Sequence, residues 1–125
     1  MLHLLLVALG GAIGSALRHL VNLAALRIAG LTFPWGTIAV NVVGSFVMGL
    51  MVEVIARRFG ASGELRLFAT TGVLGGFTTF SAFSFDALVL WERGAAIHAA
   101  AYVVSSVAIS LAALFAGLWL ARQIG

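Results

Sequence analysis

Polar side chains recur at helical spacing inside two apolar stretches of the chain. The two sets are Thr37, Asn41 and Ser45, and Tyr102, Ser106 and Ser110. Residues four apart share one face of a helix, so each set predicts a row of hydroxyl or amide groups. Such donors could take the place of water around an anion. The alternative is that they bond neighbouring helices or their own backbone, and both interpretations stay open.

A third apolar stretch is interrupted by residues that disfavour a helix. It reads Gly75-Gly-Phe-Thr-Thr-Phe-Ser-Ala-Phe-Ser84, and paired glycines and threonines are poor helix formers. In a bilayer, a break is tolerated only where it is buried in protein or lines a polar cavity. Ends of half-helices can present carbonyls to a cation or N–H groups to an anion. The segment is therefore the best candidate for an ion-handling site.

Two phenylalanines, Phe80 and Phe83, follow the interruption and lie one helical turn apart. An aromatic ring has a positive edge, so ring edges turned toward a narrow path would favour a small anion. The alternative is ordinary packing or lipid contact. Their position among serines directly after the interruption favours the path.

Few ionisable side chains lie within the apolar stretches. Arg18 lies well inside the first, where a charge is costly and usually functional; the alternative is that it extends to the membrane surface. At a pore mouth it would raise the local anion concentration. Asp86 lies beyond the interruption, and Glu53 lies near the end of the second stretch. These carboxylates are the groups that a proton-coupled exporter could use.

Composition places the chain in a membrane and argues against an enzyme. Only 9% of its residues are charged, whereas soluble domains carry about 25%. Cysteine is absent, and the three histidines have no metal-ligand spacing. We find no nucleophile–base pair or phosphate-binding loop. The net charge of +3 does not indicate nucleic acid, because the arginines are scattered and form no soluble basic face.

The elements that must position these residues are four membrane-spanning helices. A helix needs roughly 20 apolar residues to cross the hydrocarbon core. Four ranges meet this length, at about 3–26, 35–56, 66–91 and 95–121. We therefore predict an all-α integral membrane protein, a single domain over residues 1–125, with the third helix broken near 75–80.

The arginines are nearly balanced between the two sides of the membrane. One side would hold Arg57, Arg58, Arg66 and Arg122. The other would hold Arg27 and Arg93, and Arg18 if it reaches that surface. Weak positive-inside bias permits insertion in both orientations, which would lead naturally to an antiparallel homodimer. An ordinary one-way protein with modest charge asymmetry is the open alternative.

Three motifs resemble those of the CrcB/Fluc family of fluoride channels. They are the segment Gly75–Ser84, the segment Trp35-Gly-Thr-Ile-Ala-Val-Asn-Val-Val-Gly44, and Gly14-Ser-Ala-Leu-Arg18. The length and four-span layout also fit, so the resemblance covers essentially the whole chain. It implies passive, selective fluoride efflux across the inner (plasma) membrane of a microbial cell, through an antiparallel dual-topology homodimer.

The resemblance also implies roles for individual residues. Asn41, Phe80 and Phe83 would line the fluoride path, and Tyr102, Ser106 and Ser110 would form its polar track. Thr37 and Thr79 are weaker candidates for the path. A structural sodium ion at the dimer centre would be held by the backbone carbonyls of Gly75 and Thr78. Arg18 would lie in the aqueous vestibule.

One departure and two rival functions remain. Many family members carry Glu where this chain has Asp86, and the shorter side chain puts a role in ion transfer in doubt. A small dual-topology proton-coupled exporter would depend on Asp86 or Glu53. A non-transporting scaffold would use Asn41 and Phe83 only for packing.

Overall fold

Each apolar stretch forms a helix long enough to cross a membrane. The computed structural model describes residues 1–60 and 63–124. Three spans are continuous: α1 (Leu2–Ala29), α2 (Trp35–Arg58) and α6 (Ala96–Ile124). The remaining span runs from Gly63 to Glu92. The prediction of four apolar spans is confirmed, with ends a few residues from those expected.

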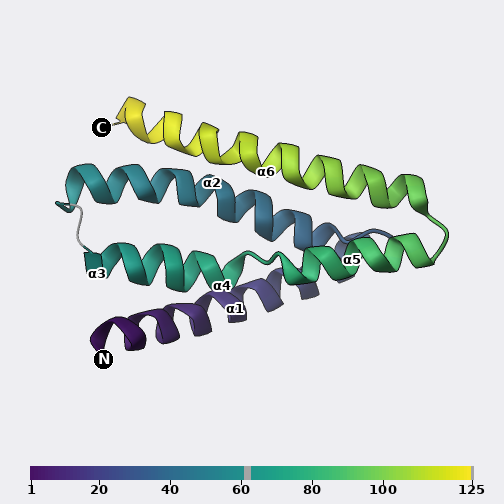
Figure 1. Cartoon of the computed structure of the whole chain (residues 1–125), viewed down its shortest axis with the longest axis horizontal. Helices are drawn as coiled ribbons and strands as arrows, with labels where there is room; N and C mark the ends of the chain where they lie inside the picture. Colours follow the sequence, from purple (N-terminus) through teal and green to yellow (C-terminus); the bar gives the residue numbers. More distant parts are fainter. Residues whose placement is uncertain (61–62, 125) are drawn as a thin grey trace.

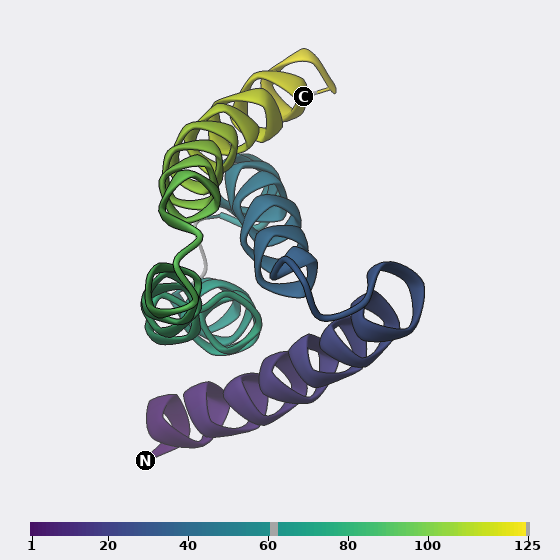
Figure 2. The same ribbon diagram turned by 90° about the vertical axis from the view of Figure 1, so that its right-hand side faces the viewer.

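The third span is made of several helical pieces. It begins with α3 (Gly63–Arg66) and the π-helix η1 (Leu67–Leu74), then continues as α4 (Gly75–Phe77) and α5 (Ser81–Glu92). Between α4 and α5, Thr78 has an extended backbone with ψ 160°. Figure 2 shows the parts before and after this point as two coils displaced sideways from each other. The span therefore bends where glycine and threonine are concentrated.

The helices end at glycines with left-handed backbone geometry. Gly30 after α1, Gly60 after α2 and Gly94 after α5 have φ of 80°, 62° and 79°, a region that glycine enters without steric cost. The connections are short, so successive spans run back and forth. Figure 1 shows both termini at the same end of the molecule.

Close backbone contacts hold the spans together. The main helix pairs are α2 with α6, and α1 with η1 and α4. A Cβ atom built on Gly10 would lie 2.7 Å from the Phe68 carbonyl, and one on Gly76 would lie 2.6 Å from the Gly11 carbonyl. Small residues allow helices to approach this closely in membranes.

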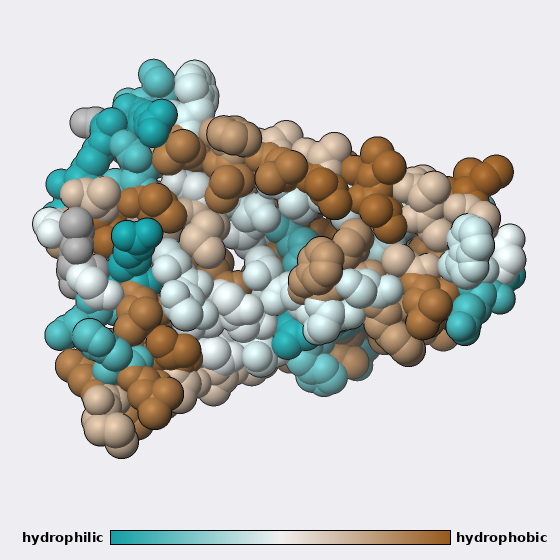
Figure 3. All heavy atoms as spheres, in the orientation of Figure 1, coloured by the Kyte–Doolittle hydropathy of each residue, from teal (hydrophilic) through white to brown (hydrophobic). Residues whose placement is uncertain are grey.

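The outer surface of the chain is largely apolar. Tryptophans near span ends are exposed, including Trp35 (50%), Trp91 (65%) and Trp119 (63%). In Figure 3, hydrophilic residues gather at the left and right ends of the molecule, and hydrophobic side chains cover the upper helix between them. Exposed apolar surface of this extent is compatible with lipid around the helices.

Candidate functional site

A groove opens where α2, the bend of the third span and α6 meet. Its volume is about 300 Å³, and we call it the central groove. Six of the residues predicted to line an ion path contribute to its wall. These are Asn41, Thr79, Phe80, Phe83, Ser106 and Ser110. The groove thus brings together side chains from three spans that are far apart in the sequence.

The amide of Asn41 holds the bend of the third span. Its Nδ2 donates to the Thr79 carbonyl at 3.0 Å, and its Oδ1 accepts from the Thr79 N–H at 2.8 Å. The amide therefore satisfies two backbone groups that a bent helix releases. Because Nδ2 carries two hydrogens, one N–H remains beyond this pair of bonds.

Two carbonyls at the bend lose the donors that a continuous helix would provide. An α-helix would bond the Thr79 N–H to the Gly75 carbonyl and the Ala82 N–H to the Thr78 carbonyl. Instead, the Thr79 N–H donates to Asn41, and the Ala82 N–H donates to the Thr79 hydroxyl at 3.1 Å. The carbonyls of Gly75 and Thr78 are therefore released from these two bonds.

The two phenylalanines of the path differ sharply in exposure. Phe83 is 8% exposed, whereas Phe80 is 77% exposed. Their ring centroids lie 5.6 Å apart, and the Phe83 ring lies 5.2 Å from that of Tyr102. Phe83 is consequently fixed by packing, while Phe80 projects from the single chain.

The hydroxyl of Ser106 is a buried polar group without a partner. The residue is 4% exposed, and its Oγ has no hydrogen-bond partner among the described residues. Burying an unsatisfied hydroxyl is unfavourable, so such a group calls for a specific explanation. Ser106 lines the central groove, where Ser110 follows one turn further along α6.

Thr37 and Tyr102 gather around Asp86, outside the wall of the central groove. The Thr37 hydroxyl donates to Asp86 Oδ2 at 2.6 Å, and the Tyr102 hydroxyl donates to the same oxygen at 3.0 Å. Tyr102 is fully buried and Thr37 is 7% exposed. Thr37 and Asp86 line a second pocket of about 420 Å³ near the connection between α1 and α2. The second pocket shares none of its lining residues with the central groove.

Arg18 binds the third span from α1. Its Nε donates to the Gly76 carbonyl at 3.0 Å, and the side chain is partly buried. The guanidinium thus satisfies another backbone carbonyl beside the bend. This contact explains how a charged residue is held well inside an apolar helix.

Sequence reasoning singled out the polar residues but not their partners. The pairs of Asn41 with Thr79, Thr37 with Asp86, and Arg18 with the Gly76 carbonyl all join different spans. One signal was available, because every polar group at membrane depth needs a partner. Choosing among partners requires the relative depth of the spans, which the sequence does not specify.

The fold and site together define a small, multi-pass helical membrane protein with a polar groove at a bent helix. A family model described as "CrcB-like protein, Camphor Resistance (CrcB)" matches residues 5–118. The chain belongs to this family, which confirms the resemblance carried by its motifs.

Curated relatives match essentially the whole chain. "Fluoride-specific ion channel FluC" of Chelativorans sp. (strain BNC1) is 64% identical over 124 residues, covering 99% of each chain. Proteins with the same name from Agrobacterium fabrum and Mesorhizobium japonicum are 59% and 57% identical, again over 99% of each chain.

Proposed function

We propose that this chain forms a fluoride-selective channel that releases fluoride passively across the cell's inner membrane. Relatives named as fluoride-specific channels, at up to 64% identity over nearly the full chain, support this function. The central groove is the structural observation that carries it, because it gathers the predicted path residues. The protein is therefore a channel rather than an enzyme.

Fluoride is small and strongly hydrated, so a path must offer donors where water is removed. The unpartnered Ser106 hydroxyl is one such donor, and the Ser110 hydroxyl is available one turn away. The N–H of Asn41 that is left after its bonds to Thr79 is another. Ring edges of Phe80 and Phe83 add positive potential without a full charge. A narrow path with close donors would select fluoride over the larger chloride.

An antiparallel dual-topology homodimer is part of the proposal. Phe80 is 77% exposed beside the groove, and a second copy would cover both the ring and the open side of the groove. The near balance of arginines on the two sides permits insertion in both orientations. A twofold arrangement would give one groove per chain and hence two fluoride paths.

A sodium ion at the centre of the dimer would bind backbone carbonyls at the bend of the third span. Sodium is a hard cation that takes oxygen ligands, and the carbonyls of Gly75 and Thr78 are released from their helical donors. Two such carbonyls from each chain would supply four oxygens. The ion would bind the two copies together and offset the carbonyl dipoles at the bend.

The experiment is fluoride efflux from liposomes that contain the purified protein, measured with a fluoride electrode and repeated with chloride. We expect rapid fluoride release, retention of chloride, and loss of fluoride flux in Phe83→Ile. Phe115→Ile is the matched control, because Phe115 is 65% exposed on α6 and lies outside the groove wall. Absence of fluoride release from a correctly folded dimer would contradict the proposal.

A further inference from the structure

The C-terminal ends of α2 and α6 enclose a third pocket, of about 290 Å³. Its charged lining residues are Glu53, Arg57 and Arg58, and Arg122 joins them through Glu53. Its apolar lining residues are Leu50, Val54, Ala121 and Ile124. We call it the basic pocket. It shares none of these residues with the central groove.

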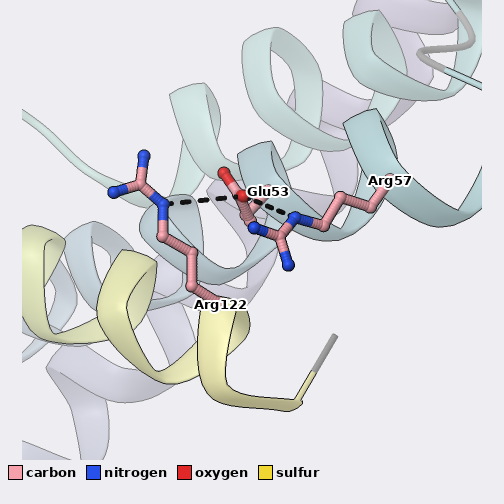
Figure 4. Close-up of polar contacts among 3 residues, drawn as sticks. All are labelled: Glu53, Arg57 and Arg122. Atoms are coloured by element: carbon pink, nitrogen blue, oxygen red, sulfur yellow. Dashed lines mark ion pairs between the residues drawn. The ribbon is translucent and has the colours of Figure 1, made fainter.

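A single carboxylate serves two arginines here. Glu53 Oε1 lies 2.7 Å from Arg57 Nε and 3.5 Å from Arg122 Nε. Figure 4 shows the carboxylate between the two side chains, with the terminal nitrogens of Arg122 pointing away from it. The arginine side chains are 44% and 55% exposed, whereas that of Glu53 is 15% exposed. With Arg58, three positive charges face one negative charge, which leaves a net charge of +2.

The basic pocket lies where the spans reach the membrane surface. Arg57, Arg58 and Arg122 occupy the last turns of two apolar helices. Basic residues at helix ends offset the negative end of the helix dipole, which explains the presence of arginine. It does not explain a hollow that is lined by both arginines and aliphatic side chains. That pairing matches a molecule with an anionic head and a hydrocarbon body.

We propose that the basic pocket binds an acidic phospholipid. The phosphate would accept hydrogen bonds from Arg57 and Arg122, since guanidinium groups bind phosphate oxygens in bidentate fashion. The acyl chain would lie against Leu50, Val54 and Ile124. A zwitterionic lipid fits less well, because its ammonium group would face the same net positive charge. The role is anchoring at the membrane surface and is independent of the fluoride path.

The test is native mass spectrometry of the delipidated protein titrated with phosphatidylglycerol or phosphatidylcholine. We expect preferential retention of phosphatidylglycerol. Each arginine near an anionic lipid contributes on the order of fivefold in affinity, so Arg57→Gln with Arg122→Gln should weaken that binding on the order of tenfold or more. The control is Arg27→Gln with Arg66→Gln, which removes the same charge outside the basic pocket.

A gain of binding separates lipid recognition from a folding defect. Glu53→Gln removes the carboxylate that competes for Arg57 and Arg122. Phosphatidylglycerol should therefore bind this variant more tightly than it binds the unaltered protein. Equal retention of the two lipids, or an equal loss of binding in the two double variants, would overturn the proposal. Displacement of phosphatidylglycerol by inorganic phosphate alone would also overturn it, because the pocket would then recognise a free anion.

Discussion

Asn41 has two tasks, and a single amide group serves both. It bonds both the N–H and the carbonyl of Thr79, and in the proposed channel it also donates to fluoride. The amide group is suited to both, because it offers two donors and an acceptor in one plane. The bend and the path therefore depend on one side chain.

Replacing Asn41 with alanine should lower stability and fluoride flux together. The Thr79 N–H and carbonyl would lose their partners, at a cost of about 1–3 kcal/mol for each buried unsatisfied group. Thermal unfolding in detergent would measure the stability. Ser45→Ala, one turn along the same helix face, is the control and should change unfolding far less. Equal effects of the two variants would contradict a special role for Asn41.

Ser106 offers the reverse test, in which fluoride flux should change while stability stays nearly the same. Its hydroxyl has no partner among the described residues, so Ser106→Ala removes no internal hydrogen bond and should change stability by less than about 1 kcal/mol. Fluoride flux should fall, because the path loses a donor. Ser105→Ala is the control, since the Ser105 hydroxyl bonds the Tyr102 carbonyl of its own helix. Unchanged flux in Ser106→Ala would show that this serine is not part of the fluoride path.

At the scale of elements, the four spans were predictable and the pitch of the third was not. Apolar length alone located the spans, because a bilayer requires every backbone group to bond within its own helix. The π-helix η1 could not be foreseen from hydrophobic periodicity. It lies where Gly72 packs against Gly10 of α1, so a tertiary contact contributes to its geometry. The Thr70 hydroxyl also bonds the Arg66 carbonyl of its own span.

The candidate site, like the fold, was only partly predictable from the sequence. Spacing predicted that Asn41, Ser106 and Ser110 would each lie in a polar row, and the structure places all three on the central groove. Spacing also grouped Thr37 with Asn41 and Tyr102 with Ser106, but Thr37 and Tyr102 bond Asp86 instead. A row on one helix face extends through the membrane, so its members meet different partners at different depths.

The contact between α1 and α4 predicts a steric effect at Gly76. A methyl group there would lie 2.6 Å from the Gly11 carbonyl, and overpacking a close contact costs about 1–3 kcal/mol. Gly76→Ala should therefore lower the unfolding temperature and displace the bend. Gly11→Ala is the matched control, because a methyl group at that position meets no atom within 4 Å. A stable Gly76→Ala variant with full flux would contradict this account of the contact.

At the scale of the whole molecule, orientation in the membrane decides whether two grooves can form. The chain contains no cysteine, so a single introduced cysteine reports topology without further changes. In intact cells, Glu64→Cys should react with a membrane-impermeant maleimide in roughly half of the chains. Glu92→Cys, beyond the third span, should give the same fraction. Complete labelling of one variant and none of the other would establish a single orientation and contradict the dual-topology dimer.

The most direct test of the central claim is the reversal potential of purified protein in a planar bilayer. With a tenfold fluoride gradient and equal chloride on both sides, a passive fluoride channel should carry current that reverses near the fluoride equilibrium potential, about 59 mV in magnitude. The value should not shift when a pH gradient is imposed. A reversal potential near zero would show that fluoride is not selected, and one that follows the pH gradient would support a proton-coupled exporter.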